Sequence, residues 1–216
     1  MNMHNFLFLT SNIQKAKDLT NLGINVKKFS IEIPEILSDD VEDVVLYKAK
    51  DTELNNILVE DTALYVEGAH FLGTEIKHVY EEIKNDLSFH DRKAIWKVSI
   101  CLRKDDEFYI STGVLEGKLS YPELDYGYHF NKLLSVDIYK DNNYRVFETL
   151  TNKEKILFGP RFIAVNQLKE ALSTGDFKKV KVINMKDVKE WDGEYQVEKV
   201  KPNKSTPCFS LLKPSL

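Results

Sequence analysis

The stretch that decides how this chain folds is ILVEDTAL, Ile57 to Leu64. It opens on an apolar run, which is typical of a strand buried inside an α/β sheet. Two adjacent carboxylates, Glu60 and Asp61, follow the run directly. Burying acidic side chains is unfavourable unless they are paired or hold a metal, so we expect the strand to end at this pair.

Shorter signals on both sides of ILVEDTAL predict alternating strands and helices. The predicted strands cover residues 5–10, 26–33, 57–59, 95–102, 107–119 and 180–183. The predicted helices cover residues 13–22, 41–54, 74–87 and 162–172. The two long strands are expected to pair antiparallel across Lys104-Asp105-Asp106. This order favours a mixed α/β sheet over an all-helical or all-β fold.

Composition narrows the class of protein. The 216 residues are 43% hydrophobic and 30% charged, which suits one domain or two closely joined lobes. A net charge of −4 offers no general attraction for nucleic acid, so nucleic-acid binding is not expected. The two cysteines, Cys101 and Cys208, lack CxxC spacing and fit a reducing compartment. With no signal peptide and no run near the ~18 apolar residues of a membrane span, we expect a cytoplasmic protein.

The chain divides by composition near residue 175. Residues 1–175 carry the periodic patterns and are predicted to form the main domain. Residues 176–216 contain nine lysines against six acidic residues and show little regular period. We interpret this second part as a basic extension that packs on the body or is partly flexible.

The first candidate site is Thr10-Ser11-Asn12 with Lys15, where a predicted strand passes into a helix. A helix start presents free backbone N–H groups and the positive end of the helix dipole, an arrangement that suits phosphate. Lys15 lies one turn into the helix and would add a full positive charge. The same residues also fit an ordinary N-cap beside a surface lysine, and no P-loop pattern is present.

Carboxylates form the second group of candidates. Glu35 follows Pro34 just beyond a predicted strand and is a reasonable Mg²⁺ ligand, since Mg²⁺ combines a few carboxylates with water and phosphate. Glu60 and Asp61 are neighbours on an extended chain, so their side chains point to opposite faces. One of them can then face a cleft, because open α/β sheets bind ligands beyond strand ends. A solvated loop start is the competing interpretation.

Two later loops complete the candidates. In the first, Tyr126 and Tyr128 flank Gly127 and precede His129. These rings would stack a nucleobase or, equally, plug a hydrophobic gap. The second loop runs from residue 153 to 161 and places Lys155 and Arg161 before a helix, where cations reach phosphates or a base edge. The alternative there is a basic loop with a Gly-Pro turn.

Taken in order, these segments resemble the motifs of the inosine-triphosphate pyrophosphatase family. The family's Thr-Gly-Asn loop and lysine, its Leu-Pro-Glu turn and its Val-Glu-Asp-Thr-Ser-Leu core match Thr10–Asn12 with Lys15, Ile33–Glu35 and Val59–Leu64. Four further motifs match Lys48-Ala49, Phe71–Lys77, Asp125–Phe130 and Thr149–Arg161. The resemblance runs from about Phe6 to about Leu172.

The resemblance implies an elongated, two-lobed mixed sheet with flanking helices and an active cleft between the lobes. It also implies Mg²⁺-dependent hydrolysis of a nucleoside triphosphate, of the inosine or xanthosine type, to monophosphate and pyrophosphate by a homodimer. Glu35 and Asp61 would hold the metal, and Asp61 would orient or deprotonate water, helped by Glu60 and Lys15. Substrate would be bound by Thr10, Ser11, Asn12, Lys155, Tyr126, Tyr128, His129 and Arg161.

The chain departs from the family where the base is read. His129 stands in place of an aspartate, and Gly159-Pro160 stands in place of the Ser-His that precedes Arg161. Because unpaired polar atoms in a base pocket change selectivity by orders of magnitude, we expect altered base specificity. Two other functions stay open: a nucleotide-binding sensor or sequestering protein with weakened hydrolysis, and an interaction module that uses the basic extension.

Overall fold

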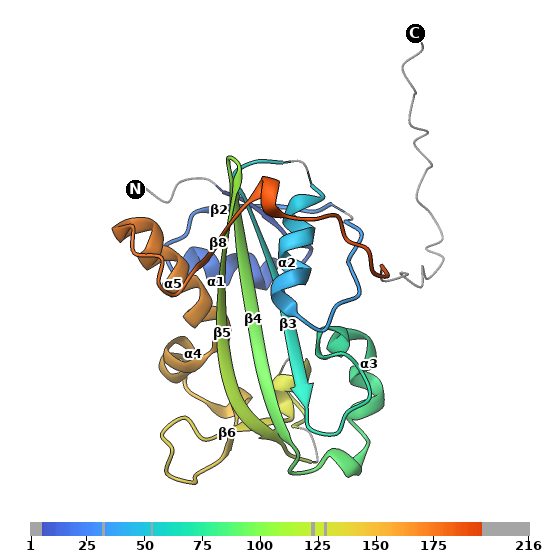
Figure 1. The fold of residues 1–216 in the computed structure, drawn as a ribbon. Helices are drawn as coiled ribbons and strands as arrows, with labels where there is room; N and C mark the ends of the chain where they lie inside the picture. The colour runs from blue at the N-terminus through green and yellow to red at the C-terminus, as the bar shows by residue number, and fades with distance from the viewer. Residues whose placement is uncertain (1–5, 32, 53, 122–123, 128, 196–216) are drawn as a thin grey trace, which may run out of the picture.

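A computed structural model of the chain describes residues 6–31, 33–52, 54–121, 124–127 and 129–195. Within these residues, one mixed sheet has the order β2-β1-β3-β4-β5-β6-β7, and β8 pairs with β5 (Figure 1). The strands are β1 Phe6–Leu9, β2 Val26–Phe29, β3 Ile57–Val66, β4 Lys93–Lys104, β5 Glu107–Leu119, β6 Leu134–Val136, β7 Arg145–Val146 and β8 Lys181–Asn184. β1 pairs parallel with β2 and β3, and the remaining pairs are antiparallel. The predicted mixed α/β sheet is confirmed.

Five α-helices are described: α1 Ile13–Asn21, α2 Val41–Lys50, α3 Ile76–Ile83, α4 Asn152–Phe158 and α5 Pro160–Thr174. Short 3-10 turns are η1 Gly73–Glu75, η2 Leu87–Phe89, η3 His129–Lys132, η4 Phe147–Thr149 and η5 Met185–Asp187. The predicted stop of the last helix is confirmed, since Gly175 caps α5 in the left-handed conformation. None of the described helices is both long and apolar enough to cross a membrane.

The prediction that the central strand ends at Glu60-Asp61 is wrong. β3 continues to Val66, and it pairs with β4 through both acidic positions, Glu60 opposite Ile100 and Asp61 opposite Ser99. Burial of the two carboxylates is offset by cations that reach them from distant segments of the chain. The acidic pair therefore lies in the middle of a ten-residue strand rather than at its end.

Other predicted boundaries are too long, each for a local reason. The strand expected at 26–33 stops at Phe29, because its four-residue partner β1 offers no further pairing. The helix expected at 41–54 stops at Lys50, where the Arg103 guanidinium donates hydrogen bonds to the carbonyl oxygens of Ala49 and Lys50. The helix expected at 74–87 is a 3-10 turn followed by α3, which ends where the Tyr121 hydroxyl donates to the Ile83 carbonyl.

The hydrophobic core divides the elongated molecule into two lobes. In one lobe, α1 and α5 pack on one face of the sheet around Phe8 and Leu58, and α2 packs on the other around Val45 and Val59. In the second lobe, α3, β6 and the 3-10 turns η3 and η4 surround Trp96, toward the opposite end of the sheet (Figure 1). The long strands β3, β4 and β5 run through both lobes and join them.

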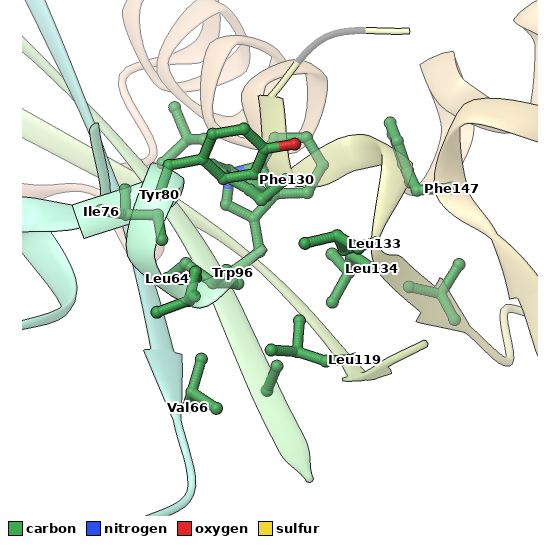
Figure 2. Close-up of a cluster of buried hydrophobic side chains, with 14 of the residues drawn as sticks. Leu64, Val66, Ile76, Tyr80, Trp96, Leu119, Phe130, Leu133, Leu134 and Phe147 are labelled. Carbon is green, nitrogen blue, oxygen red and sulfur yellow. The ribbon is translucent and has the colours of Figure 1, made fainter. Parts of the chain in front are cut away.

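Aromatic packing centres the second lobe on Trp96 (Figure 2). Its ring meets Phe130 and Phe147 edge-on, with centroids 5.3 and 4.9 Å apart. Edge-to-face pairs of this kind stabilise a core beyond their buried area. The indole Nε1 donates to the Thr62 hydroxyl at 2.9 Å. This side of the lobe is therefore tied directly to β3, one residue beyond the acidic pair.

Replacing Gly113 by alanine should lower the free energy of unfolding by about 1–3 kcal/mol, the usual range for overpacking a core. A Cβ at Gly113 would stand 1.9 Å from the Pro160 carbonyl oxygen, so the first turn of α5 would be displaced from β5. Urea denaturation of both proteins measures the difference. The neighbouring variant Val114→Ala, at an exposed position, should stay within about 0.5 kcal/mol of the parent. Equal losses in both variants would contradict this packing.

Candidate active site

A cavity of about 1140 Å³ opens between the two lobes. Residues of the first lobe, including Thr10 and Lys15, line one end of it, and Trp96 and Phe130 of the second lobe line the other. Both carboxylates of the acidic pair reach its wall. The volume is at the upper end of small-molecule sites, and its mixed polar and aromatic lining is typical of them. The predicted cleft between lobes is therefore present in the structure.

Glu60 organises the side of the cavity formed by α1 and α5. Its carboxylate accepts from Arg161 through two bonds of 2.9 and 3.2 Å, and Lys15 Nζ lies 3.0 Å away. Arg161 also donates to Asp18 on α1 at 2.9 Å. Burial alone would raise the pKa of the Glu60 carboxyl, but Arg161 and Lys15 outweigh it and the pKa is lowered. Glu60 is consequently a buried anion that holds two cations at the cavity wall.

Asp61 organises the opposite side, formed by α2. Lys48 Nζ lies 2.7 Å from an Asp61 oxygen and 2.7 Å from a Glu35 oxygen, while Lys77 reaches the other Glu35 oxygen at 2.8 Å. Burial would raise the pKa of Asp61, but the charge of Lys48 holds it at about 2, below the ordinary 3.8. Burial would raise the pKa of Glu35, but the charges of Lys48 and Lys77 and the hydrogen bond from Lys48 together lower it. Both carboxyl groups are therefore ionised at neutral pH.

The pair of Glu35 and Asp61 fits a divalent cation. Two ionised carboxylates from different segments converge on one positive charge, the Lys48 ammonium, beside the cavity. Mg²⁺ is commonly held by one or two carboxylates, with water and substrate phosphate completing its shell. Among the described residues there is no cluster of three or more acidic, histidine or cysteine side chains that would hold a metal alone. Glu35 and Asp61 therefore suit a metal ion whose remaining ligands are water and the phosphate groups of a bound substrate.

The start of α1 lines one end of the cavity. Asn12 is the N-cap, and its side-chain oxygen accepts from the backbone N–H groups of Gln14 and Lys15 at 2.9 and 3.4 Å. The Thr10 hydroxyl accepts from the Asn12 N–H at 3.1 Å. Thr10, Ser11, Asn12 and Lys15 all line the cavity. The predicted helix start is confirmed, and its binding of phosphate stays a prediction.

The remaining predicted residues are distributed unevenly. The loop predicted at residues 153–161 is wrong, because Thr151 caps helix α4 over Asn152–Phe158 and α5 begins at Pro160. Lys155 lies on α4, lines the cavity and pairs with Glu148 at 3.3 Å. Tyr126 is exposed and lies outside the cavity lining. Tyr128 lies outside the described residues, and His129 is described only as the first residue of η3. The structure therefore brings the predicted phosphate and carboxylate residues together, whereas the predicted base-stacking residues are not assembled by the described part of the chain.

Lys48 is the principal residue of the site to which the sequence analysis assigned no role. It lies on the buried face of α2, one position after Tyr47 and beside the fully buried Ala49. The apolar positions Val41, Val44 and Val45 predict that residue 48 falls on the same stripe of the helix. A lysine on an otherwise apolar stripe is unusual unless it is paired, and this was the available signal. Lys77 and Asp18 had no comparable signal, since both lie at polar positions of their segments.

Acid should destabilise the start of α4, next to Lys155, through Glu154. A hydrogen bond from Arg145 and the capping box with Thr151 hold the pKa of Glu154 at about 2, below the ordinary 4.5. A lowered pKa stabilises the fold above the ordinary value, and this contribution is lost as pH falls toward 2. Thermal melts between pH 5 and pH 2 should therefore fall less steeply for Glu154→Gln than for the parent. Parallel curves would contradict the proposed ionisation of Glu154.

Fold and site together define a class. An open mixed sheet carries a cleft with buried, ionised carboxylates on one strand and lysines around them, which is typical of α/β proteins that bind phosphorylated ligands with a divalent cation. The chain belongs to the Ham1 family, whose family model matches residues 6–171.

Three curated relatives are named dITP/XTP pyrophosphatase. The chain is 29% identical over 184 residues to the protein of Thermococcus kodakarensis, covering 76% of this chain and 97% of the relative. It is 31% identical over 129 residues to that of Pyrococcus horikoshii, covering 52% and 68%. It is 31% identical over 88 residues to that of Methanopyrus kandleri, covering 37% and 47%. The first alignment takes in nearly the whole relative, which leaves part of this chain without a counterpart.

Proposed function

We propose that this protein is a nucleoside-triphosphate pyrophosphatase that converts a noncanonical or modified nucleoside triphosphate to its monophosphate and pyrophosphate with Mg²⁺. The family match and the activity named for the three relatives support hydrolysis of a triphosphate. The observation that carries the proposal is the pair on β3, because Glu60 and Asp61 point to opposite faces and collect separate sets of cations beside one cavity.

Charge placement explains how this chain would favour the reaction. Hydrolysis of a phosphoanhydride depends mostly on positioning and on stabilising negative charge. Lys15, at the start of α1, and Lys155, across the cavity, would bind phosphate oxygens. Glu35 and Asp61 would hold Mg²⁺, which neutralises phosphate charge when bound. A polyanionic substrate would then be held between the helix start and the carboxylate pair.

Asp61 would also position the attacking water. A carboxylate with a pKa of about 2 is a weak proton acceptor, so full removal of a proton from water is not its main contribution. It accepts hydrogen bonds well, and its second oxygen is already fixed by the Thr62 N–H at 2.8 Å. We therefore assign Asp61 the role of orienting water, with Glu60 holding Lys15 and Arg161 in place behind it.

Base specificity is expected to differ from that of the relatives. Arg161, a predicted substrate ligand, has its guanidinium engaged by Glu60 and Asp18. The second-lobe end of the cavity is instead lined by two aromatic residues and two residues with side-chain amides, Phe130, Phe147, Asn131 and Asn152. Amides pair with either donors or acceptors, so they would read a different base edge from an arginine. The homodimer remains a prediction from the family resemblance, and the cytoplasmic location remains a prediction from the sequence.

A substrate panel tests the proposed function. The protein with Mg²⁺ is incubated with ITP, XTP, dUTP, the eight standard nucleoside triphosphates and several modified bases, and pyrophosphate and orthophosphate are measured separately. Pyrophosphate from a subset of bases is the expected result. Orthophosphate with nucleoside diphosphate would contradict the proposal. Tight binding of one nucleotide with no hydrolysis of any would favour a sensor or sequestering protein.

A further inference from the structure

The segment after the family match is folded and attached to the sheet. The family model ends at residue 171, whereas the structure describes the chain to residue 195. β8 pairs antiparallel with β5, with Phe108 opposite Ile183. The Met185 N–H then donates to the Asp106 carbonyl at 2.7 Å. From this point residues 185–195, here called the strap, continue past the end of α2 to its far side (Figure 1).

The strap is fixed to α2 at two side chains. The Tyr47 hydroxyl donates to the Lys189 carbonyl at 3.1 Å, and its ring meets Trp191 edge-on with centroids 5.2 Å apart. Lys50 donates to the same carbonyl at 3.3 Å and pairs with Glu190 at 2.9 Å. The ion pair is exposed at Glu190 and adds little stability. Met185 and Val188 also hold the start of the strap, since they pack against the core cluster around Val45 and Val59. Beyond Val188, Trp191 is the apolar anchor on α2 through its ring contact with Tyr47.

The far end of the strap joins the loop that carries Glu35. The Leu37 N–H donates to the Glu194 carbonyl at 2.8 Å, and Ile36 forms an antiparallel bridge with Tyr195. Ile36 is only 1% exposed. The preceding residue, Glu35, points to Lys48 and Lys77. Backbone pairing one residue from Glu35 limits the positions that its carboxylate can take.

No described residue of the strap lines the main cavity. The strap lies against α2 and the Glu35 loop, with Pro34, Lys50 and Tyr195 around a separate, shallow pocket. This placement argues against a lid formed by these residues. It fits a support that acts on the site from behind.

We propose that the strap positions Glu35, and that it thereby sets how tightly the pair of Glu35 and Asp61 takes a divalent cation. Trp191 is a positioning residue in this scheme, since it acts through Tyr47 and the backbone of residues 36–37 and touches no reacting group. The proposal rests on the proposed function only in the identity of the ligand, a divalent cation. Groups that orient metal ligands commonly change metal affinity by about 10- to 100-fold when they are lost.

The test compares Trp191→Ala with Trp191→Phe, which keeps an aromatic ring, and with Lys186→Ala, an exposed change on the same strap. In metal-free protein, Trp191→Ala should speed hydrogen exchange at the Leu37 amide about tenfold or more, while the amides of β3 and β4 keep their protection. Its dissociation constant for Mn²⁺, measured by titration of free Mn²⁺, should rise about tenfold. Trp191→Phe should keep most of the parental protection at the Leu37 amide and most of the parental Mn²⁺ affinity. Lys186→Ala should match the parent in both.

Three outcomes would overturn the proposal. One is unchanged exchange at Leu37 in Trp191→Ala. Another is faster exchange at Leu37 with unchanged Mn²⁺ affinity, which would make the strap a packing element only. The third is equal loss of protection throughout β3 and β4, which would indicate general destabilisation. Neither hydrogen exchange nor Mn²⁺ affinity depends on turnover. If the wild-type protein hydrolyses no nucleotide, the proposed function is contradicted, and these two measurements still test the role of the strap.

Discussion

Asp61→Asn should lower turnover by about 10²- to 10⁴-fold while nucleotide binding is retained. The amide keeps the size of the carboxylate but loses the charge that Lys48 balances at 2.7 Å and that a divalent cation would need. Phosphate binding by Lys15 and Lys155 does not depend on that charge. Pyrophosphate release under saturating substrate gives the turnover, and equilibrium binding of the substrate in the absence of metal gives the affinity.

The matched control for this variant is Asp106→Asn. Asp106 lies in the exposed turn between β4 and β5, and it is not among the residues that line the cavity. This change should leave turnover within experimental error of the parent. Parental turnover in Asp61→Asn would contradict the role assigned to Asp61. Loss of both turnover and folded structure would require repeating the comparison at a lower temperature, where a folded Asp61→Asn protein must still fail to turn over.

Lys48→Met should destabilise the protein by about 3–5 kcal/mol, the range observed when one partner of a buried charge pair is removed. Methionine fills similar volume, but Glu35 and Asp61 then face each other without the ammonium that holds both their pKa values low. At least one carboxyl group should consequently take up a proton near neutral pH. Chemical denaturation gives the loss of stability.

Divalent metal should stabilise Lys48→Met more than the parent. In the variant, Mg²⁺ replaces a missing positive charge between the two carboxylates, whereas in the parent it competes with Lys48. The expected result is a larger rise in melting temperature with Mg²⁺ for the variant. Lys17→Met, at an exposed position of α1, should lose at most about 0.5 kcal/mol and show the same rise in melting temperature with Mg²⁺ as the parent. Equal responses of Lys48→Met and the parent would contradict a cation site at Glu35 and Asp61.

Sequence patterns were enough to predict the mixed sheet and the start of the central strand. Apolar runs and helix signals gave the mixed sheet, and strand geometry gave the divergence of Glu60 and Asp61 toward opposite sets of partners. The extent of β3 was not predictable in the same way. Arg161, whose charge offsets the burial of Glu60, lies 101 residues away in the chain. No local sequence pattern could therefore predict that Glu60 is buried within the strand.

Side-chain pairing also limited what could be predicted of the site. Arg161 matches a family motif, yet Glu60 and Asp18 engage its guanidinium, so its contribution in this structure is to hold α1, α5 and β3 together. Lys48 was recognised as part of a motif and not as the cation between Glu35 and Asp61. The strap was unpredictable for a further reason, since its contacts with residues 36–37 are made by backbone groups, which carry no sequence signature.

The proposed pyrophosphatase function is tested most directly by the ratio of products from the best nucleoside triphosphate of the panel, measured with Mg²⁺ on the wild-type protein. We expect equal amounts of nucleoside monophosphate and pyrophosphate, with no orthophosphate, and loss of both products in Asp61→Asn. Orthophosphate and nucleoside diphosphate as the products, or equal product formation by Asp61→Asn, would contradict this expectation.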